Sequence, residues 1–301
     1  MSIAFCSRPA PPSFEGRAML LGLLAVAMFS LTLPFTRIAV AELDPMFVTF
    51  GRALGAALLA GAWLAWKGAA LPPRAALPAL ALVAGGCIIG FPLLTSFALR
   101  TLPASHGALL VGVLPLATAL YSALRGHERP SRGFWGMALL GSGLVVAFAL
   151  VQGGGALHLA DLLVFGAVAC AAIGYAEGGR LSRTLGGPET ICWALLLAAP
   201  AALLLLSWQG LPATRGVGLR AWLAFGYVTT FSMLIGFFFW YRGLALGGVA
   251  RVGQVQLLQP FLSLLGAALL LGEALTATHT LFALAVAAVV FAGRRMTVAQ
   301  R

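Results

Sequence analysis

Ten apolar runs, each about twenty residues long, follow one another along the chain with only short polar intervals between them. A helix of about 20 residues crosses the ~30 Å hydrocarbon core of a bilayer, and its backbone groups satisfy one another there. Hydrophobic residues make up 61% of the 301 positions and charged residues 9%, a balance that the surface of a water-soluble domain of this size could not carry. We therefore predict an all-α polytopic membrane protein.

The runs also indicate where the ten expected transmembrane helices begin and end. These helices span 17–40, 45–66, 75–99, 103–124, 133–151, 159–182, 189–208, 219–243, 248–271 and 276–294. The longest interval, 209–218, is too short for a soluble domain and contains the glycines and proline of a turn. Ala39-Val40-Ala41 resembles a signal-peptide cleavage site, but the apolar stretch before it is too long for one, so we expect the first helix to be retained.

The positions of the basic residues indicate the orientation, because loops rich in Lys and Arg stay in the cytoplasm. With the N-terminus inside, all but five of the 19 basic residues fall on the cytoplasmic side. The five on the outer side are Arg37, Arg52, Arg100, Arg215 and Arg220. We expect a multi-pass protein of the inner (plasma) membrane with both termini cytoplasmic. The basic residues are scattered, so the net charge of +11 does not indicate nucleic-acid binding.

Two segments align without a gap at an offset of 145 residues, which suggests an internal repeat. Pro115 and Glu128 are 13 positions apart, and so are Pro260 and Glu273. The two segments belong to the fourth and ninth runs, which cross the membrane in opposite directions, so we predict two inverted five-helix repeats. The expected organisation is a cytoplasmic tail at 1–16, a first repeat at 17–151, a loop at 152–158, a second repeat at 159–294 and a cytoplasmic tail at 295–301.

Short motifs in both halves carry a resemblance to a known family. They are Leu258-Gln259-Pro260 with Leu271-Gly272-Glu273, Trp240-Tyr241 with Ala245-Leu246, and Pro45 with Phe50 and Arg52. In these residues, and over about 17–294, the chain resembles the EamA-type transporters of the drug/metabolite transporter superfamily. It departs from that pattern at His127-Glu128, which stands where the second half has Gly272-Glu273, and at Phe29-Ser30, where many members have Trp-Gly.

The resemblance implies a carrier that moves small metabolites outward by alternating access. The chain length and the aromatic eighth run are most similar to those of the bacterial amino-acid exporters, including exporters of aromatic amino acids. Other small organic cargoes, such as drugs, nucleobases or polyamines, are alternatives from the same family. A membrane-embedded enzyme or a structural protein is an alternative from another class. The expected partners are a small-molecule substrate and the lipid bilayer; a monomer is compatible with the sequence, which leaves the oligomeric state open.

Signatures of enzymes and of bound metals are missing from the sequence. It has no P-loop and no H-E-x-x-H motif, and its four histidines, His106, His127, His158 and His279, stand at four different loop or span ends. The four cysteines are far apart with no C-x-x-C pair, which favours packing over metal or disulfide chemistry. We therefore expect no catalytic residues, no cofactor and no metal.

Polar residues in the ninth run are candidates for substrate binding. Gln256, Gln259 and Ser263 lie within about 60° on one face of a helix. Each would leave unsatisfied polar groups in lipid, so this face should meet another helix or a wet cavity. Hydrogen bonding between helices and contact with substrate are equally compatible with the pattern.

The eighth run places aromatic and hydroxyl side chains at three- and four-residue steps. Tyr227, Thr230 and Phe238 belong to this face, which would suit a small amphipathic solute with a bulky side chain. Trp240 and Tyr241 fit an interfacial aromatic belt better than a cavity. Tyr175 in the sixth run and Thr95 in the third are further candidates for substrate binding.

Four prolines within apolar runs are candidate hinges, since each removes a backbone donor and weakens the local helix. They are Pro34, Pro92, Pro115 and Pro260, and the alternative is a static kink filled by packing.

The eight acidic residues lie outside the spans or towards their ends. Glu177 is the deepest, and Arg180 follows it at a spacing that favours a local ion pair over a proton relay. We therefore expect transport without obligatory ion coupling.

Overall fold

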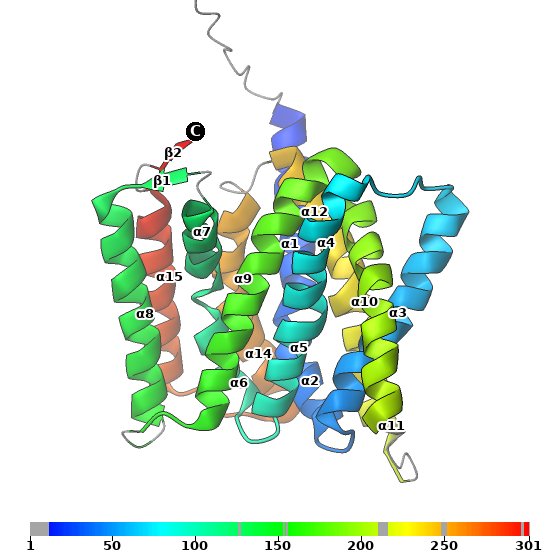
Figure 1. The fold of residues 1–301 in the computed structure, drawn as a ribbon. Helices are drawn as coiled ribbons and strands as arrows, with labels where there is room; N and C mark the ends of the chain where they lie inside the picture. Colours follow the sequence, from blue (N-terminus) through cyan, green and yellow to red (C-terminus); the bar gives the residue numbers. More distant parts are fainter. Residues whose placement is uncertain are drawn as a thin grey trace, which may run out of the picture.

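The computed structural model describes residues 12–125, 128–152, 154, 156–209, 216–247, 252–295 and 298–300. The chain forms a bundle of helices that run up and down along one axis, and the described N-terminal helix starts at the same end as the C-terminal strand (Figure 1). Within the described residues, eight helical spans are long and apolar enough to cross a membrane, and Val255–Leu271 and Ala277–Ala292 are shorter apolar helices. Each of the ten apolar runs overlaps one of these segments.

In the first half of the chain, the described residues form eight α-helices. They are α1 (Pro12–Ser30), α2 (Thr32–Val40), α3 (Pro45–Lys67), α4 (Leu77–Val83), α5 (Phe91–Ala98), α6 (Ala104–Val111), α7 (Leu114–Leu124) and α8 (Arg132–Gln152). A short 3₁₀ helix, η1 (Arg74–Ala76), precedes α4, and a π-helical segment, η2 (Ala84–Gly90), joins α4 to α5. Three of the expected spans, the first, third and fourth, are therefore built from more than one helical piece.

The described part of the second half contains six α-helices. They are α9 (Leu159–Leu185), α10 (Gly187–Gln209), α11 (Leu219–Tyr227), α12 (Gly236–Gly247), α14 (Gln259–Leu271) and α15 (Ala277–Arg295). A π-helical segment, η3 (Val228–Ile235), joins α11 to α12, and a 3₁₀ helix, η4 (Gly253–Leu258), precedes α14.

Two short strands, β1 (Glu128–Pro130) and β2 (Val298–Gln300), pair in antiparallel fashion. The rest of the regular structure in the described residues is helical, so the all-α fold class holds and these six residues are a local addition to it. They lie where the apolar pattern stops, so the backbone there is free to pair with another segment instead of with its own helix.

Local sequence explains how α3 begins and ends. The side chain of Asp44 accepts hydrogen bonds from the backbone N–H groups of Met46 and Phe47, and Pro45 occupies the first helical position, where no donor is needed. At the other end, Gly68 takes a left-handed conformation (φ 62°) that lets its N–H bond back to the helix.

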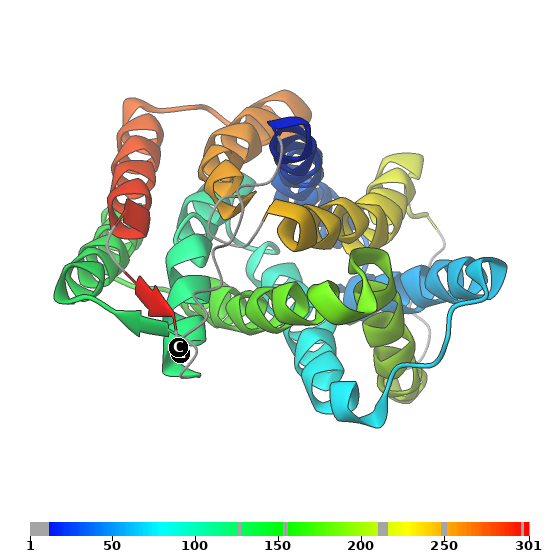
Figure 2. The ribbon, with the colours of Figure 1, turned by 90° about the horizontal axis from the view of Figure 1, so that it is seen from above.

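The main helix contacts join the two halves of the chain. α1 packs against α12, α5 against α9, α3 against α10, α6 against α14 and α8 against α15. The α8–α15 pair and the α3–α10 pair lie at opposite edges of the bundle (Figure 2). The pairs are symmetric between the halves. The first span packs on the eighth as the sixth packs on the third, and the second, fourth and fifth spans each pack on the span five places later.

Glycines bring the backbones close where α9 meets η2. A Cβ added at Gly86 would overlap the carbonyl oxygen of Cys170, and one added at Gly174 would overlap the sulfur of Cys87. Small residues at such crossings allow the close packing that stabilises helix association in a membrane.

Trp240 and Tyr241 do not belong to an interfacial belt, so that interpretation of the sequence was wrong. Their exposed fractions are 2% and 0%, and the Tyr241 hydroxyl donates to the Gly174 carbonyl oxygen at 3.1 Å. The rotation of α12 about its own axis turns both rings towards α9 and α1, and the contacts of neighbouring helices determine that rotation.

Some predicted features lie outside the described residues. They are positions 1–11 of the N-terminal tail, His127, positions 153 and 155 of the 152–158 loop, Arg215, positions 248–251 at the start of the ninth run, and positions 296, 297 and 301 of the C-terminal tail.

Candidate functional site

The four candidate hinge prolines each stand just after an interruption of a helix. Pro34 is the third residue of α2, and Pro92, Pro115 and Pro260 are the second residues of α5, α7 and α14. Early helical positions have no backbone donor to satisfy, so a proline starts a new helical piece there at little cost. Pro200, in contrast, lies inside the continuous helix α10.

The interrupted spans meet around a small interior cavity, which we call the main cavity, of about 30 Å³. Its lining includes the aromatic rings of Phe29, Phe91, Tyr175 and Phe237, the guanidinium of Arg52 and the polar groups of Thr32, Ser232 and Gln259. A smaller second cavity, of about 10 Å³, shares Leu33, Val111, Leu114 and Gln259 with it. The two cavities are therefore adjacent, and residues from both halves of the chain line them.

The aromatic wall of the main cavity is a packed cluster. The ring of Phe29 lies 4.9 Å from that of Phe237 and 6.2 Å from that of Tyr175, measured between centroids. Tyr175 and Phe237 meet edge to face at 5.9 Å. Such a cluster offers ring faces and edges to an aromatic or aliphatic ligand group. Phe29, which departs from the family pattern, thus contributes to the centre of this wall.

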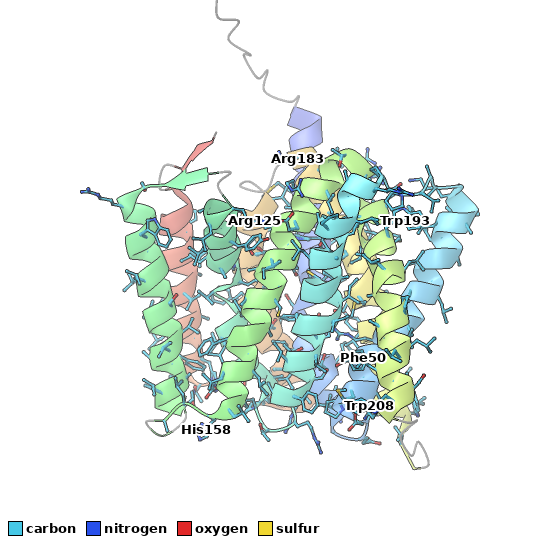
Figure 3. All side chains as sticks on the ribbon, viewed as in Figure 1. Phe50, Arg125, His158, Arg183, Trp193 and Trp208 are labelled. Carbon is cyan, nitrogen blue, oxygen red and sulfur yellow. The ribbon has the colours of Figure 1, made fainter. Side chains whose placement is uncertain are left out.

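Arg52 is the cationic group of the main cavity. It is the eighth residue of α3 and only 2% exposed, so counting it among the outer-side arginines was wrong. Phe50, which precedes Arg52 by two positions on α3, is labelled in Figure 3 and shows about where along the helix Arg52 lies. Among the described residues, Nε and Nη1 of Arg52 are buried without a hydrogen-bond partner. A buried charge without a partner is strongly unfavourable, and it usually marks a functional position in a membrane span.

The polar residues of the ninth run all line the second cavity. Gln256 lies in η4, whereas Gln259 and Ser263 lie in α14, so they do not share one regular helix. All three nevertheless reach the same space, and Gln259 lines both cavities. Nε2 of Gln256 is buried with no partner in the described part of the chain.

Tyr175 is the other predicted substrate residue that lines a cavity. Thr95 is fully buried, and its hydroxyl donates to the carbonyl oxygen of Phe91 at 2.7 Å, which is a bond within its own helix. Thr230 is half-buried and lines neither cavity.

The two aromatic candidates of the eighth span also lie away from both cavities. The Tyr227 hydroxyl donates to the carbonyl oxygen of Met28 at 3.1 Å, and its ring stacks on Phe35 at 4.2 Å. Phe238 packs against Trp63 at 5.1 Å. In their place, η3 and α12 present Ser232, Met233 and Phe237 to the main cavity.

The buried carboxylate of Glu177 is held in an ion-pair network at the Arg183 end of the bundle (Figure 3). One oxygen accepts from the Tyr121 hydroxyl at 3.0 Å and from Arg125 Nε at 3.3 Å, and the other accepts from Arg180 Nη2 at 3.0 Å. The local ion pair with Arg180 is confirmed. Glu177 lines neither cavity.

Histidines gather at the opposite end, so the inference that they are spread apart was wrong. His106 Nε2 lies 2.7 Å from Asp161 Oδ1, His158 approaches the same carboxylate, and the Phe148 ring lies between His106 and His279. Their positions far apart in sequence hid this proximity. No group of three or more His, Cys, Asp or Glu in the described residues could hold a metal ion.

The relatives of the chain point to one family. Residues 16–151 and 158–293 each match the model of the EamA-like transporter family. "Uncharacterized transporter YdeK" of Bacillus subtilis (strain 168) is 47% identical over 252 residues, which cover 84% of this chain and 88% of the relative. This chain belongs to the EamA-like transporter family. It is a multi-pass membrane transporter.

A solved structure titled "Crystal structure of protein" has the same fold. It matches with a TM-score of 0.63 and 21% identity, over 92% of this chain and 96% of the other.

The Leu-Gly-Glu motif of this EamA-like chain has a structural explanation. Gly272 ends α14 in a left-handed conformation (φ 70°). The carboxylate of Glu273 then accepts hydrogen bonds from the backbone N–H groups of Ala104 and Ser105, both at 2.8 Å. These are free donors at the start of α6, where a negative charge is favourable. The motif therefore fastens the end of α14 to the beginning of α6.

Proposed function

We propose that this transporter exports small organic metabolites, with amino acids, including aromatic ones, as its cargo. The observation that carries the proposal is the main cavity, where an aromatic cluster and a single cationic group face the same space. The bulky side chain of an aromatic amino acid would lie against Phe29, Tyr175 and Phe237.

Alternating access is the proposed mechanism, with two inverted five-helix repeats in ten spans as the moving parts. The breaks before Pro115 and Pro260 line the second cavity, and an added Cβ at Gly112 would lie 3.1 Å from the Pro260 ring. Broken helices from the two halves thus meet at the cavity wall. Tilting their pieces would open the cavity first to one end of the bundle and then to the other.

Transport is proposed to need no obligatory ion coupling. Among the described residues, no aspartate or glutamate lines either cavity. Glu177 lines neither cavity and is held by Tyr121 and by the cationic groups of Arg125 and Arg180, which argues against a role in carrying a proton or sodium ion. The neutral groups of Gln256, Gln259 and Ser263 would bind polar parts of the cargo instead.

The cavity favours amino acids over polyamines among the family's possible cargoes. A polyamine is a multiple cation, and Arg52 would repel it in a space with little water. Both cavities lie within one chain, so a monomer would suffice as the transporting unit. The proposed location is the inner membrane, with both termini in the cytoplasm.

The test is solute counterflow into proteoliposomes that contain the purified protein alone, with protein-free liposomes as the control. We expect saturable counterflow of L-phenylalanine or L-tyrosine, and no accumulation above equilibrium when a pH or sodium gradient is imposed. Absence of saturable movement for every amino acid tried would refute the proposed cargo. Accumulation driven by a gradient would refute the uncoupled mechanism.

A further inference from the structure

Arg52 differs from other arginines of this chain in how its donors are used. Arg37 donates to the carbonyl oxygens of Leu99 and Arg100, and Arg220 donates to that of Leu270. These bonds satisfy carbonyl groups at helix ends, which is a structural role. Arg52 has no such bond from Nε or Nη1 in the described residues, although it is far more buried than either.

The surroundings of Arg52 offer no compensating negative charge. The described residues that line the main cavity with it are aromatic, aliphatic, hydroxyl, thiol or amide side chains. The hydroxyls of Thr32 and Ser232 are 2.8 Å apart and bond to each other. A guanidinium can only donate, so the group that completes this site must be an acceptor, and the best acceptor is a carboxylate that takes two parallel N–H bonds.

The mouth of the bundle nearest to Arg52 is also basic. Arg37, Arg100 and Arg220 line an open vestibule there, together with the single carboxylate of Glu42. Helix α3 starts at this end of the bundle. Arg52 is its eighth residue and so lies about 10 Å from the start of the helix, measured along the helix axis. An excess of positive charge at such a mouth raises the local concentration of anionic groups.

We infer that Arg52 binds the carboxylate of the transported solute, so that the site selects carboxylic acids and amino acids over the corresponding amines. This inference rests on the proposed function because it concerns the same cavity. The aromatic cluster of Phe29, Tyr175 and Phe237 would hold the apolar part of the solute, while Arg52 holds its charged end. The charge of Arg52 is then compensated only while the solute is bound.

The first experiment compares three probes that share a phenyl group. They are L-phenylalanine, 3-phenylpropionate, which lacks the ammonium group, and 2-phenylethylamine, which lacks the carboxylate. We expect 3-phenylpropionate to compete with counterflow of labelled L-phenylalanine at least about tenfold better than 2-phenylethylamine, as for a hydrogen bond to a charged group. Equal competition by the acid and the amine would overturn the inference.

The second experiment uses variants of Arg52 and a matched control. Arg52→Met keeps the length and removes the charge, Arg52→Lys keeps the charge, and Arg74→Gln changes an exposed arginine outside the cavities. We expect Arg52→Met to lose counterflow, Arg52→Lys to retain part of it, and Arg74→Gln to behave as the wild type. An Arg52→Met protein that still prefers the acid to the amine would overturn the inference.

Thermal stability of the purified protein separates binding from a structural role. Without solute, Arg52→Met should melt at the wild-type temperature or above it, because it removes a buried charge that has no partner. A structural role predicts a lower melting temperature instead. Adding 3-phenylpropionate should raise the melting temperature of the wild type but not that of Arg52→Met.

The same measurement distinguishes failure of the inference from failure of the proposed cargo. If the wild type moves none of the three probes, the proposed cargo is wrong. Selective stabilisation of the wild type by 3-phenylpropionate would still support carboxylate binding at Arg52. Absence of that stabilisation, together with a lower melting temperature for Arg52→Met, would overturn the inference.

Discussion

The contact between α9 and α12 allows a quantitative prediction for Gly178→Ala. A methyl group at Gly178 would overlap the hydroxyl oxygen of Tyr241, and even the ring atom Cε1 would lie only 2.6 Å away. Tyr241 is fully buried and donates to the Gly174 carbonyl oxygen at 3.1 Å. Its ring cannot move aside without breaking this bond and displacing Phe237, whose centroid lies 5.3 Å away.

The expected loss of stability combines three terms. Overpacking costs about 1–3 kcal/mol, and loss of the Tyr241 hydrogen bond costs about 1 kcal/mol. Replacing glycine by alanine in a helix returns up to about 1 kcal/mol. The net destabilisation of Gly178→Ala is therefore about 1–4 kcal/mol. Because Phe237 lines the main cavity, the substitution should also slow transport.

Thermal unfolding in detergent measures this effect. Each kcal/mol should lower the melting temperature by about 2–4 °C. The matched control is Gly143→Ala on α8, where an added Cβ has no neighbour within 4 Å, so its melting temperature should stay the same or rise slightly. A Gly178→Ala protein that melts at or above the wild-type temperature would show that the packing argument is mistaken.

Three further predictions concern gating, coupling and topology. Pro115→Ala and Pro260→Ala should slow exchange in liposomes at normal expression, whereas Pro200→Ala in an uninterrupted helix should not; wild-type rates in the first two would exclude hinges there. Glu177→Gln should cost about 1–2 kcal/mol of stability, since its arginine partners stay about half exposed and hydrated, and should leave flux independent of a pH gradient. Gradient-driven accumulation that disappears in this variant would contradict uncoupled transport. A cysteine replacing Arg129 should react only with reagents that reach the cytoplasm, and labelling from outside would reverse the assigned topology.

The candidate site could be predicted only in part. Gln256, Gln259 and Ser263 were found because polar groups inside an apolar run must have partners, and they do line a cavity. Tyr227 and Phe238 were placed on a cavity wall by helical periodicity, yet they contact Phe35 and Trp63 instead. Periodicity gives a face relative to the other residues of the same helix, but it does not say which neighbour that face meets.

Arg52 illustrates the same limit for charge. An arginine eight positions into a span can extend to the interface or point inwards, and both are compatible with its place in the sequence. Its burial depends on Phe29, Cys87, Tyr175 and Phe237, which come from four other spans. The one available signal was an ionisable residue inside an apolar run, which by itself suggests a functional position.

The sequence by itself determined the class of this protein, because a bilayer requires apolar helices of about 20 residues and leaves few alternatives for a chain with 9% charged residues. It also indicated where helices can be interrupted, since proline lacks the backbone donor that a continuous helix needs, although Pro200 lies inside the continuous helix α10. The tertiary structure alone decided which side chains surround the cavity and which ionisable groups have partners. Those contacts join residues from both halves, and their distances depend on how each helix is rotated and packed against the others.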